Sequence, residues 1–422
     1  MSFNTAVAGI KASGTSLEII GNNISNAGTT GFKSSRGEFA DVFATSLLGS
    51  SSNAVGKGVA VSGVSQAFTQ GNISFTNNVL DMAINGGGFF VLNDDGSNVY
   101  SRAGNFQVDR SGYVVNPAGN RLQIFNTTAA GVPTSGLADL QIDSSLIQPA
   151  PTSVVNIAAN LDSRSIVPAT AWPAAGFDAF ASPATAPTSD MYNASTSATV
   201  YDSQGNAHVQ SVYFVKGAAQ NEWDVHTLID GVTVSGPDTI TFDSSGQIPA
   251  ASLPFEVNIT GWTPLDSTGA TTGAAAQDFD VDLSVLSQFG SDFSVTNIDQ
   301  DGFTTGQLSG VEVGDAGIVF ARFTNGQSRA LGQIALSSFT NSTGLQPLGG
   351  SIWGETFASG QPIMGGPGTN GLGTVQSGAL EDSNVEVSSE LVNMIVAQRN
   401  FQANAKVIQT EDAITQTVIN LR

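Results

Sequence analysis

The chain has 422 residues, which is long enough for two or three domains with cores of their own. Its 35 acidic side chains outnumber 14 basic ones, and the net charge of −21 disfavours binding to nucleic acid or to an anionic membrane. The absence of cysteine excludes disulfide bonds, thiolate metal sites and cysteine nucleophiles. No apolar run reaches the ~18 residues of a membrane-spanning helix, and the first residues lack the pattern of a cleavable signal peptide. We therefore expect no membrane insertion.

The first segment carries an apolar repeat that predicts a helix of about 22 residues. The main row of this repeat recurs every seven residues and consists of Phe3, Ile10, Leu17 and Ile24. Ile20 belongs to a second row, which lies between members of the main row. Gly28 and Gly31 follow this pattern and are expected to end the helix.

A repeat of the same period predicts a second helix at the other end of the chain. Its main row consists of Val387, Met394, Phe401 and Ile408. Leu391 and Ala405 belong to an interleaved row. Ser383 and Glu386 have the spacing of a capping box, so we expect the helix to begin near Ser383 and to extend ~50 Å to Arg422.

Between the helices the sequence alternates with period two and is interrupted by turn residues, which is typical of β-strands. Six short runs between residues 82 and 125 predict a β-meander. Further strands are predicted by alternation in several later segments: 198–202, 209–215, 223–229, 318–323 and 330–337. The glycine-rich stretch 359–379 predicts an irregular connection to the second helix.

These elements predict a multi-domain, mainly β protein. Its N- and C-terminal α-helices are expected to pair as a coiled-coil-like core domain, with nested β-rich outer domains between them. We divide the chain into four parts: a helical polymerisation core (1–27 and 383–422), a connecting joint (28–70 and 359–382), an inner β-domain (71–145 and 301–358) and an outer β-domain insertion (146–300).

Two hypotheses explain the apolar helices, because both stripes must be buried somewhere. They could form a private hairpin on their own β-domain, or they could associate with other copies of the chain. Away from the stripes, both helices carry uncharged polar side chains such as Ser13, Asn22 and Thr410. Such faces suit helices that pack on all sides, which favours self-association. The predicted polymerisation interface therefore consists of the residues of both stripes.

Short segments at both ends resemble the signatures of the bacterial flagellar axial proteins, the family of rod, hook and hook-associated subunits. They are NNISNAGTTGFK at 22–33, SNVEVS at 383–388 and AQRNFQAN at 397–404. The residues that carry the resemblance are Asn22, Asn23, Asn26, Gly31, Phe32, Lys33, Ser383, Asn384, Arg399 and Asn404. The stretches 83–90 and 100–106 resemble the inner β-domain that the family shares. Within the family, the run LGQIAL at 331–336 and the long insertion are most similar to hook subunits.

The resemblance implies a structural subunit that assembles into a helical tube, which acts as a universal joint and transmits torque from the basal-body rod to the filament. It implies as partners other copies of the chain, the rod, hook-cap and hook–filament junction proteins, and the type III export apparatus. It places the protein outside the cell in the flagellum, exported from the cytoplasm without a cleaved signal peptide. It implies no cofactor.

The sequence offers no catalytic, cofactor-binding or metal site. His208 and His226 are expected at or near the surface of strands, with no carboxylate spaced to complete a metal site. The acidic groups around Asp280 and Asp301 lack the twelve-residue calcium loop, and the glycines at 86–88 lack the spacing of a dinucleotide loop. We expect a protein that is not an enzyme.

Two alternatives remain open on sequence grounds. One is another flagellar axial protein, such as a distal rod subunit or a hook–filament junction subunit. A junction subunit would cap growth and would not polymerise extensively. The other is a β-rich surface adhesin with a coiled-coil stalk, which should carry a secretion signal.

Overall fold

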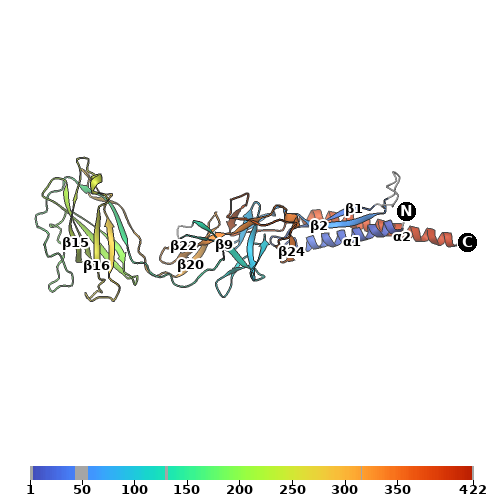
Figure 1. The fold of residues 1–422 in the computed structure, drawn as a ribbon, viewed down its shortest axis with the longest axis horizontal. Coiled ribbons are helices and arrows are strands. Elements are labelled where there is room, and N and C mark those ends of the chain that lie inside the picture. The colour runs from blue at the N-terminus through green and yellow to red at the C-terminus, as the bar shows by residue number, and fades with distance from the viewer. Residues whose placement is uncertain (1–2, 43–55, 129–131, 315, 421–422) are drawn as a thin grey trace. The chain divides into compact units, whose positions relative to one another are not determined.

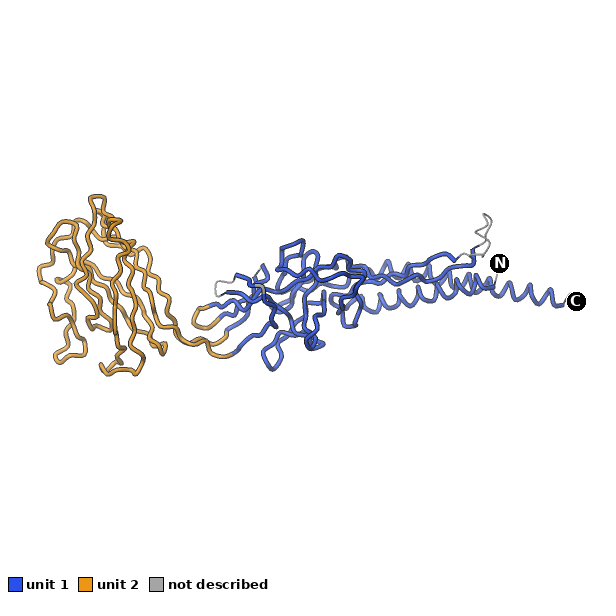
Figure 2. The backbone as a smooth tube through the Cα atoms, in the orientation of Figure 1, with its two compact units in different colours: residues 1–144, 309–322, 328–422 blue, residues 145–308, 323–327 orange. Residues whose placement is uncertain are grey.

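The computed structural model describes residues 3–42, 56–128, 132–314 and 316–420. They form two compact units: unit 1 with residues 1–144, 309–322 and 328–422, and unit 2 with residues 145–308 and 323–327 (Figure 2). Both units are mainly β, and both long helices belong to unit 1. The predicted fold class is therefore confirmed. Parts of three predicted segments lie outside the described residues: 43–55 of the joint, 1–2 and 421–422 of the core, and 129–131 and 315 of the inner β-domain.

The two terminal helices lie side by side, as predicted (Figure 1). Helix α1 spans Phe3–Ser25 and helix α2 spans Val387–Asn420. Neither helix combines enough length with enough apolar character to cross a bilayer. The predicted start of α2 at a Ser383 capping box is wrong. The Asn384 side chain donates to the Ala67 carbonyl and accepts from the Ser34 amide, which holds this segment out of the helix, so the first helical bond joins the Glu390 amide to the Glu386 carbonyl.

Two strands in the predicted joint form a hairpin that the sequence analysis did not anticipate. Strand β1 (Ser35–Asp41) pairs antiparallel with β2 (Val59–Gln66), and both strands contact α1. Glycines permit the close approach, since a Cβ at Gly58 would lie 3.0 Å from the Ala8 Cβ, and one at Gly37 would lie 3.1 Å from the Ile19 Cδ1. One face of α1 is thus covered by its own chain.

The inner sheet of unit 1 contains the predicted meander. Its strands are β5 (Phe89–Asp94), β6 (Ser97–Ser101), β7 (Gln107–Val108), β8 (Val114–Val115), β9 (Arg121–Thr127), β10 (Pro133–Asp139), β20 (Leu308–Val313), β21 (Ile318–Phe323), β22 (Ser328–Ile334), β23 (Leu336–Ser338), β24 (Gln346–Gly349), β25 (Ile352–Gly354) and β26 (Ile363–Gly365). Aromatic rings fill its core in edge-to-face contacts, among them Phe89 with Trp353 and Tyr100 with Phe339.

Short strand pairs connect this sheet to the helices. Strand β4 (Met82–Asn85) leaves the meander and pairs with β27 (Thr374–Ser377), and β3 (Ile73–Phe75) pairs with β28 (Ala379–Glu381). The prediction that the stretch 359–379 is irregular is therefore wrong, because the stretch contains β26 (Ile363–Gly365) and β27. Its many glycines suggested a loop, but several of them adopt positive φ in the tight turns between these short strands, for example Gly371 with a φ of 76°.

Unit 2 contains two sheets that share one apolar core. The first has the order β12 (Ala194–Tyr201), β13 (Ala207–Lys216), β14 (Glu222–Ile229) and β15 (Val232–Thr241). The second contains β16 (Glu256–Trp262), β17 (Gln277–Asp282), β11 (Val154–Asp162), β18 (Ser287–Phe289) and β19 (Ser294–Gln300). Alternate residues point inward, as in Val212 and Phe214. His208 and His226 were expected near the surface, but they are 4% and 5% exposed. Trp262 of the second sheet packs against the His208 ring, and Trp172 stacks on the His226 ring. Strand alternation alone does not reveal these contacts.

Candidate functional site

The seam between α1 and α2 is narrow and partly polar. The positions of α2 that are not exposed recur mostly three, four or seven residues apart: Glu390, Met394, Ala397, Asn404, Ala405, Val407, Ile408 and Glu411. Asn404 packs directly on α1, since a Cβ at Gly9 would lie 2.6 Å from its Oδ1. The backbones therefore approach closely here, and a small residue on α1 is required.

The structure places the residues of the predicted stripes in different environments. Only Ile20 is buried, at 8% exposure. Six others are half-buried: Ile10, Leu17, Ile24, Met394, Ala405 and Ile408. Four are exposed: Phe3, Val387, Leu391 and Phe401. Pairing of the two helices thus leaves much of the predicted interface uncovered.

Helix α2 exposes further apolar side chains besides those of its main row. They are Val392, Ile395, Val396, Ile414, Val418 and Ile419, which are each half or more exposed. Leu391, Val392 and Ile395 lie within about 100° of one another around the helix axis, and we call these three residues the outer face of α2. Exposed apolar patches mark sites of association. The seven-residue rows did not include Val392 and Ile395, although the apolar run LVNMIVA at 391–397 signals a helix that is apolar on more than one side.

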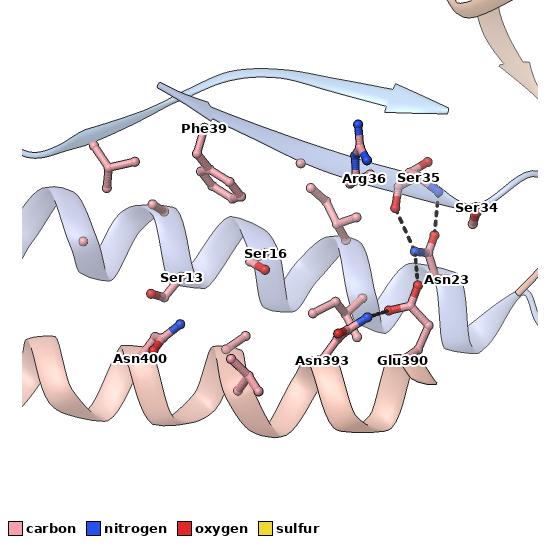
Figure 3. A pocket seen from close by; sticks show the side chains of 18 of the residues that line it. Ser13, Ser16, Asn23, Ser34, Ser35, Arg36, Phe39, Glu390, Asn393 and Asn400 are labelled. Carbon is pink, nitrogen blue, oxygen red and sulfur yellow. Dashed lines mark hydrogen bonds between the residues drawn. The ribbon is translucent and has the colours of Figure 1, made fainter. Parts of the chain in front are cut away.

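A groove of about 670 Å³ runs between α1, β1 and α2 (Figure 3). Its lining is mixed, with Ser13, Ser16 and Asn400 on the helices and Phe39 on the hairpin. Phe39 is itself 44% exposed. Among the residues that the structure describes, the groove offers hydrogen-bonding groups and one aromatic ring, without a titratable side chain positioned for catalysis.

Asn23 closes one end of this groove and joins three elements (Figure 3). Its Nδ2 donates to the Ser35 carbonyl at 2.8 Å and to the Glu390 Oε1 at 2.9 Å, while its Oδ1 accepts from the Ser35 amide at 2.9 Å. The residue is 1% exposed. A single amide therefore fixes β1 and the start of α2 on α1.

Replacing Asn23 with alanine should destabilise this junction by ~1–3 kcal/mol, because the half-buried Ser35 amide and the Glu390 Oε1 lose the Asn23 side chain as a partner. The neighbouring Asn22→Ala variant is the matched control, since the Asn22 side chain is exposed and its backbone carbonyl remains available to Asn26. Hydrogen exchange of the 35–41 amides in the full-length chain should rise in the Asn23→Ala variant only. Equal exchange in both variants would refute the junction.

A buried ionic cluster lies just beyond the helices, at the start of the β-domain. The Glu381 carboxylate accepts from the Lys33 Nζ at 2.6 Å, from the Arg102 Nη1 at 3.0 Å and from the Gly71 amide at 2.8 Å. The Lys33 and Glu381 side chains have no exposed surface. Burial lowers the pKa of Lys33 and of Arg102, and the ion pairs with Glu381 oppose that effect. The cluster ties the segment after α1 to the strand before α2.

The other signature residues divide into anchors and surface positions. The Asn26 side chain donates to the Asn22 carbonyl in the last turn of α1, and the Asn384 side chain donates to the carbonyls of Ala67 and Thr69. Gly31 has a φ of 66°, and a Cβ there would lie 2.4 Å from the Ala103 amide nitrogen. The Phe32 carbonyl accepts from the Asn384 amide, and the Ser383 hydroxyl accepts from the Val385 amide. Arg399 is exposed on α2.

Sequence reasoning missed Arg102, Glu381 and Glu390 as structural partners of the signature. Charged residues are scarce in this chain, at 12% of the total, and Arg102 and Glu381 directly follow strand residues. A charge at the end of a buried strand was the signal that could have identified them. Within the described ranges, no group of three His, Asp or Glu side chains is arranged to hold a metal ion.

Four family models match the chain in sequence order. They are described as flagella basal body rod protein (residues 3–33), flagellar hook protein FlgE/F/G D1 domain (83–165), flagellar basal body protein FlaE D2 domain (160–303) and flagellar basal body rod FlgEFG protein C-terminal (376–421). They cover both helices and parts of both units, and they leave residues 34–82 and 304–375 unmatched.

Similar proteins include curated flagellar hook proteins FlgE. The chain is 38% identical to that of Escherichia coli over 434 residues, covering all of both chains. It is 31% identical to that of Borreliella burgdorferi over 467 residues, covering all of this chain and 99% of the relative. The crystal structure of Helicobacter pylori flagellar hook protein FlgE2 matches 73% of this chain and all of its own, with a TM-score of 0.51 at 15% identity, which supports the fold.

Proposed function

The chain belongs to the flagellar hook protein family, and we propose that it builds the hook by polymerising through its paired helices α1 and α2. It is a structural subunit of the bacterial flagellar hook, the helical tube that acts as a universal joint between rod and filament. Full-length similarity to hook proteins argues against a distal-rod subunit, a junction subunit or an adhesin.

The observation that carries the proposed mechanism is the outer face of α2. Side chains such as Val392 and Ile395 are 60% and 50% exposed although α2 is already paired with α1. Covering this surface with the helices of other copies removes it from water, which stabilises a polymer by about 25 cal/mol per Å² of apolar area. Contacts between different surfaces of identical subunits generate a helical filament when the rotation between neighbours does not close a ring.

The predicted stripes take part in this interface in two ways. Half-buried members such as Met394 and Ile408 stabilise the pair within one subunit, and exposed members such as Leu391 and Phe401 contact neighbouring subunits. In the assembled tube, residues 1–27 and 383–422 form the helical core. Residues 28–70 and 359–382 form the joint, residues 71–145 and 301–358 the inner β-domain, and residues 146–300 the outer insertion.

The remaining parts of the proposal rest on the family. The subunit contacts the rod at one end of the hook, and the hook-cap and hook–filament junction proteins at the other. It leaves the cytoplasm through the type III export apparatus without cleavage of a signal peptide and acts outside the cell. It performs no catalysis.

Electron microscopy of purified protein driven to assemble by salt tests this proposal. Full-length protein should form tubes, whereas chains that lack residues 1–25 or 390–422 should stay soluble. Sedimentation measures the fraction assembled. Tube formation by both truncated chains would refute polymerisation through the terminal helices.

A further inference from the structure

His208 lies between two carboxylates at one end of unit 2. Its Nδ1 is 2.6 Å from the Asp230 Oδ2, and its Nε2 is 3.6 Å from the Asp202 Oδ2. The His208 and Asp202 side chains are 5% and 0% exposed, whereas the Asp230 side chain is 28% exposed. Because the carboxylates approach opposite ring nitrogens, the three side chains do not converge on one point as metal ligands do.

Each carboxylate also holds a turn. Asp202 accepts from the amides of Gln204 and Asn206, which shapes the turn between β12 and β13. Asp230 has a φ of 50° in the turn between β14 and β15, and its Oδ1 accepts from the Val209 amide. His208, at the start of β13, therefore lies between the two turns.

Among the described residues, the surroundings of the imidazole contain no third charge. The Trp262 ring of β16 lies edge-to-face at 5.0 Å, and Gln277 of β17 is the register partner of Trp262. Gln210 lies two residues along the inward face of β13. Asp202 and Asp230 are thus the charged groups that face His208, and with a neutral imidazole the site holds two negative charges in a buried environment.

The protonation state of the imidazole decides whether both ring nitrogens can present an N–H to a carboxylate. A neutral ring carries one N–H, so one nitrogen lone pair must face a carboxylate oxygen. A protonated ring donates from Nδ1 to Asp230, and its positive charge also attracts the Asp202 carboxylate, whose Oδ2 lies 3.6 Å from Nε2. We propose that His208, Asp202 and Asp230 form a proton-operated clamp that fastens the β12–β13 turn to the β14–β15 turn.

The direction of the pH dependence follows from these contacts. The hydrogen bond to Asp230 raises the pKa of His208 against the opposing effect of burial. A group with a raised folded-state pKa adds stability that is fully present below its ordinary pKa of about 6.5 and is lost as the pH rises through the folded-state pKa. The clamp is therefore closed in acid and open in alkali, independently of the assembly proposed above.

The chain has only two histidines, so nuclear magnetic resonance can follow both in the full-length protein. His226 stacks on Trp172 at 4.3 Å, and burial lowers its pKa. We expect the His208 ring to titrate above about pH 6.5 and the His226 ring below it. The His226→Gln variant assigns the signals. In the Asp230→Asn variant, the midpoint pH of the His208 titration should fall towards the ordinary value for histidine, while the midpoint of the His226 titration should not change. A His208 ring that remains neutral from about pH 5 to 9 would overturn the clamp.

Thermal unfolding gives a second readout for the clamp. The midpoint temperature of the wild-type chain should exceed that of the His208→Gln variant at about pH 5.5, and this difference should disappear at about pH 9. For the His226→Gln variant, the loss of midpoint temperature relative to the wild type should not be larger at about pH 5.5 than at about pH 9. A His208→Gln loss of equal size at both pH values would indicate packing alone and would overturn the proposal.

Discussion

Replacing Ile395 with aspartate is expected to abolish tube formation and to leave the monomer folded. Ile395 lies on the outer face of α2 and is 50% exposed, so the monomer tolerates a polar side chain there. In the proposed polymer the same position is buried between helices of neighbouring copies. Losing a buried isoleucine costs about 1.5–3 kcal/mol, and an unpaired carboxylate adds a desolvation penalty. Since ~1.4 kcal/mol corresponds to tenfold in affinity, the critical concentration should rise at least about tenfold to 100-fold.

The matched control is the Ile166→Asp variant. Ile166 is 80% exposed in unit 2, so the chemical change is identical but lies outside the helices. Sedimentation and electron microscopy of both variants under identical salt conditions measure assembly, and circular dichroism of the monomers measures folding. Normal assembly of the Ile395→Asp variant would contradict the role given to the outer face of α2, as would equal loss in both variants.

Replacing Glu381 with alanine is expected to give the largest loss of stability in unit 1. The substitution leaves Lys33 and Arg102 buried without the carboxylate that both contact. Removing one partner of a buried ion pair typically costs ~3–5 kcal/mol, because the remaining charge stays desolvated. The contact between the Gly71 amide and Glu381 is lost as well. Local opening around β4 and β28 should become roughly 100-fold to several thousand-fold more frequent.

Hydrogen–deuterium exchange of β4 and β28 peptides measures this effect separately from unit 2. Glu386→Ala removes a nearby glutamate that is exposed, and exchange in that variant should match the wild type. Glu381→Gln keeps a hydrogen-bond acceptor for Lys33 and should fall between the two. If the Glu381→Ala variant exchanged like the wild type, the cluster would not hold the helices to the β-domain.

The sequence predicted the main elements because their patterns are local. The heptad rows identified both helices, and period-two alternation identified the meander and the unit 2 strands β12, β13 and β14. The predictions failed where distant segments supply the partner. Asn384 stops α2 from starting at Ser383 because it bonds Ala67 and Ser34, and no local pattern encodes that contact. An irregular connection was predicted where β27 lies, because its partner strand β4 lies far away in the chain.

The residues of the candidate site were likewise predicted only in part. The seven-residue rows located Met394 and Ile408 on the helix pair, but they did not include Val392 and Ile395, which lie on the exposed side of α2. The signature contained Asn23 and Lys33 without showing what they bind. Their partners Glu390 and Glu381 lie at the far end of the chain, 367 and 348 residues further along, and only the fold brings them together.

The most direct test of the assembly mechanism is hydroxyl-radical footprinting of the full-length chain as monomer and as polymer. In the monomer, Val392, Ile395 and Val418 should be oxidised readily, in keeping with their exposure. In the polymer, these side chains should be protected several-fold, because helices of neighbouring copies cover them. Equal oxidation of α2 in monomer and polymer would contradict assembly through the terminal helices.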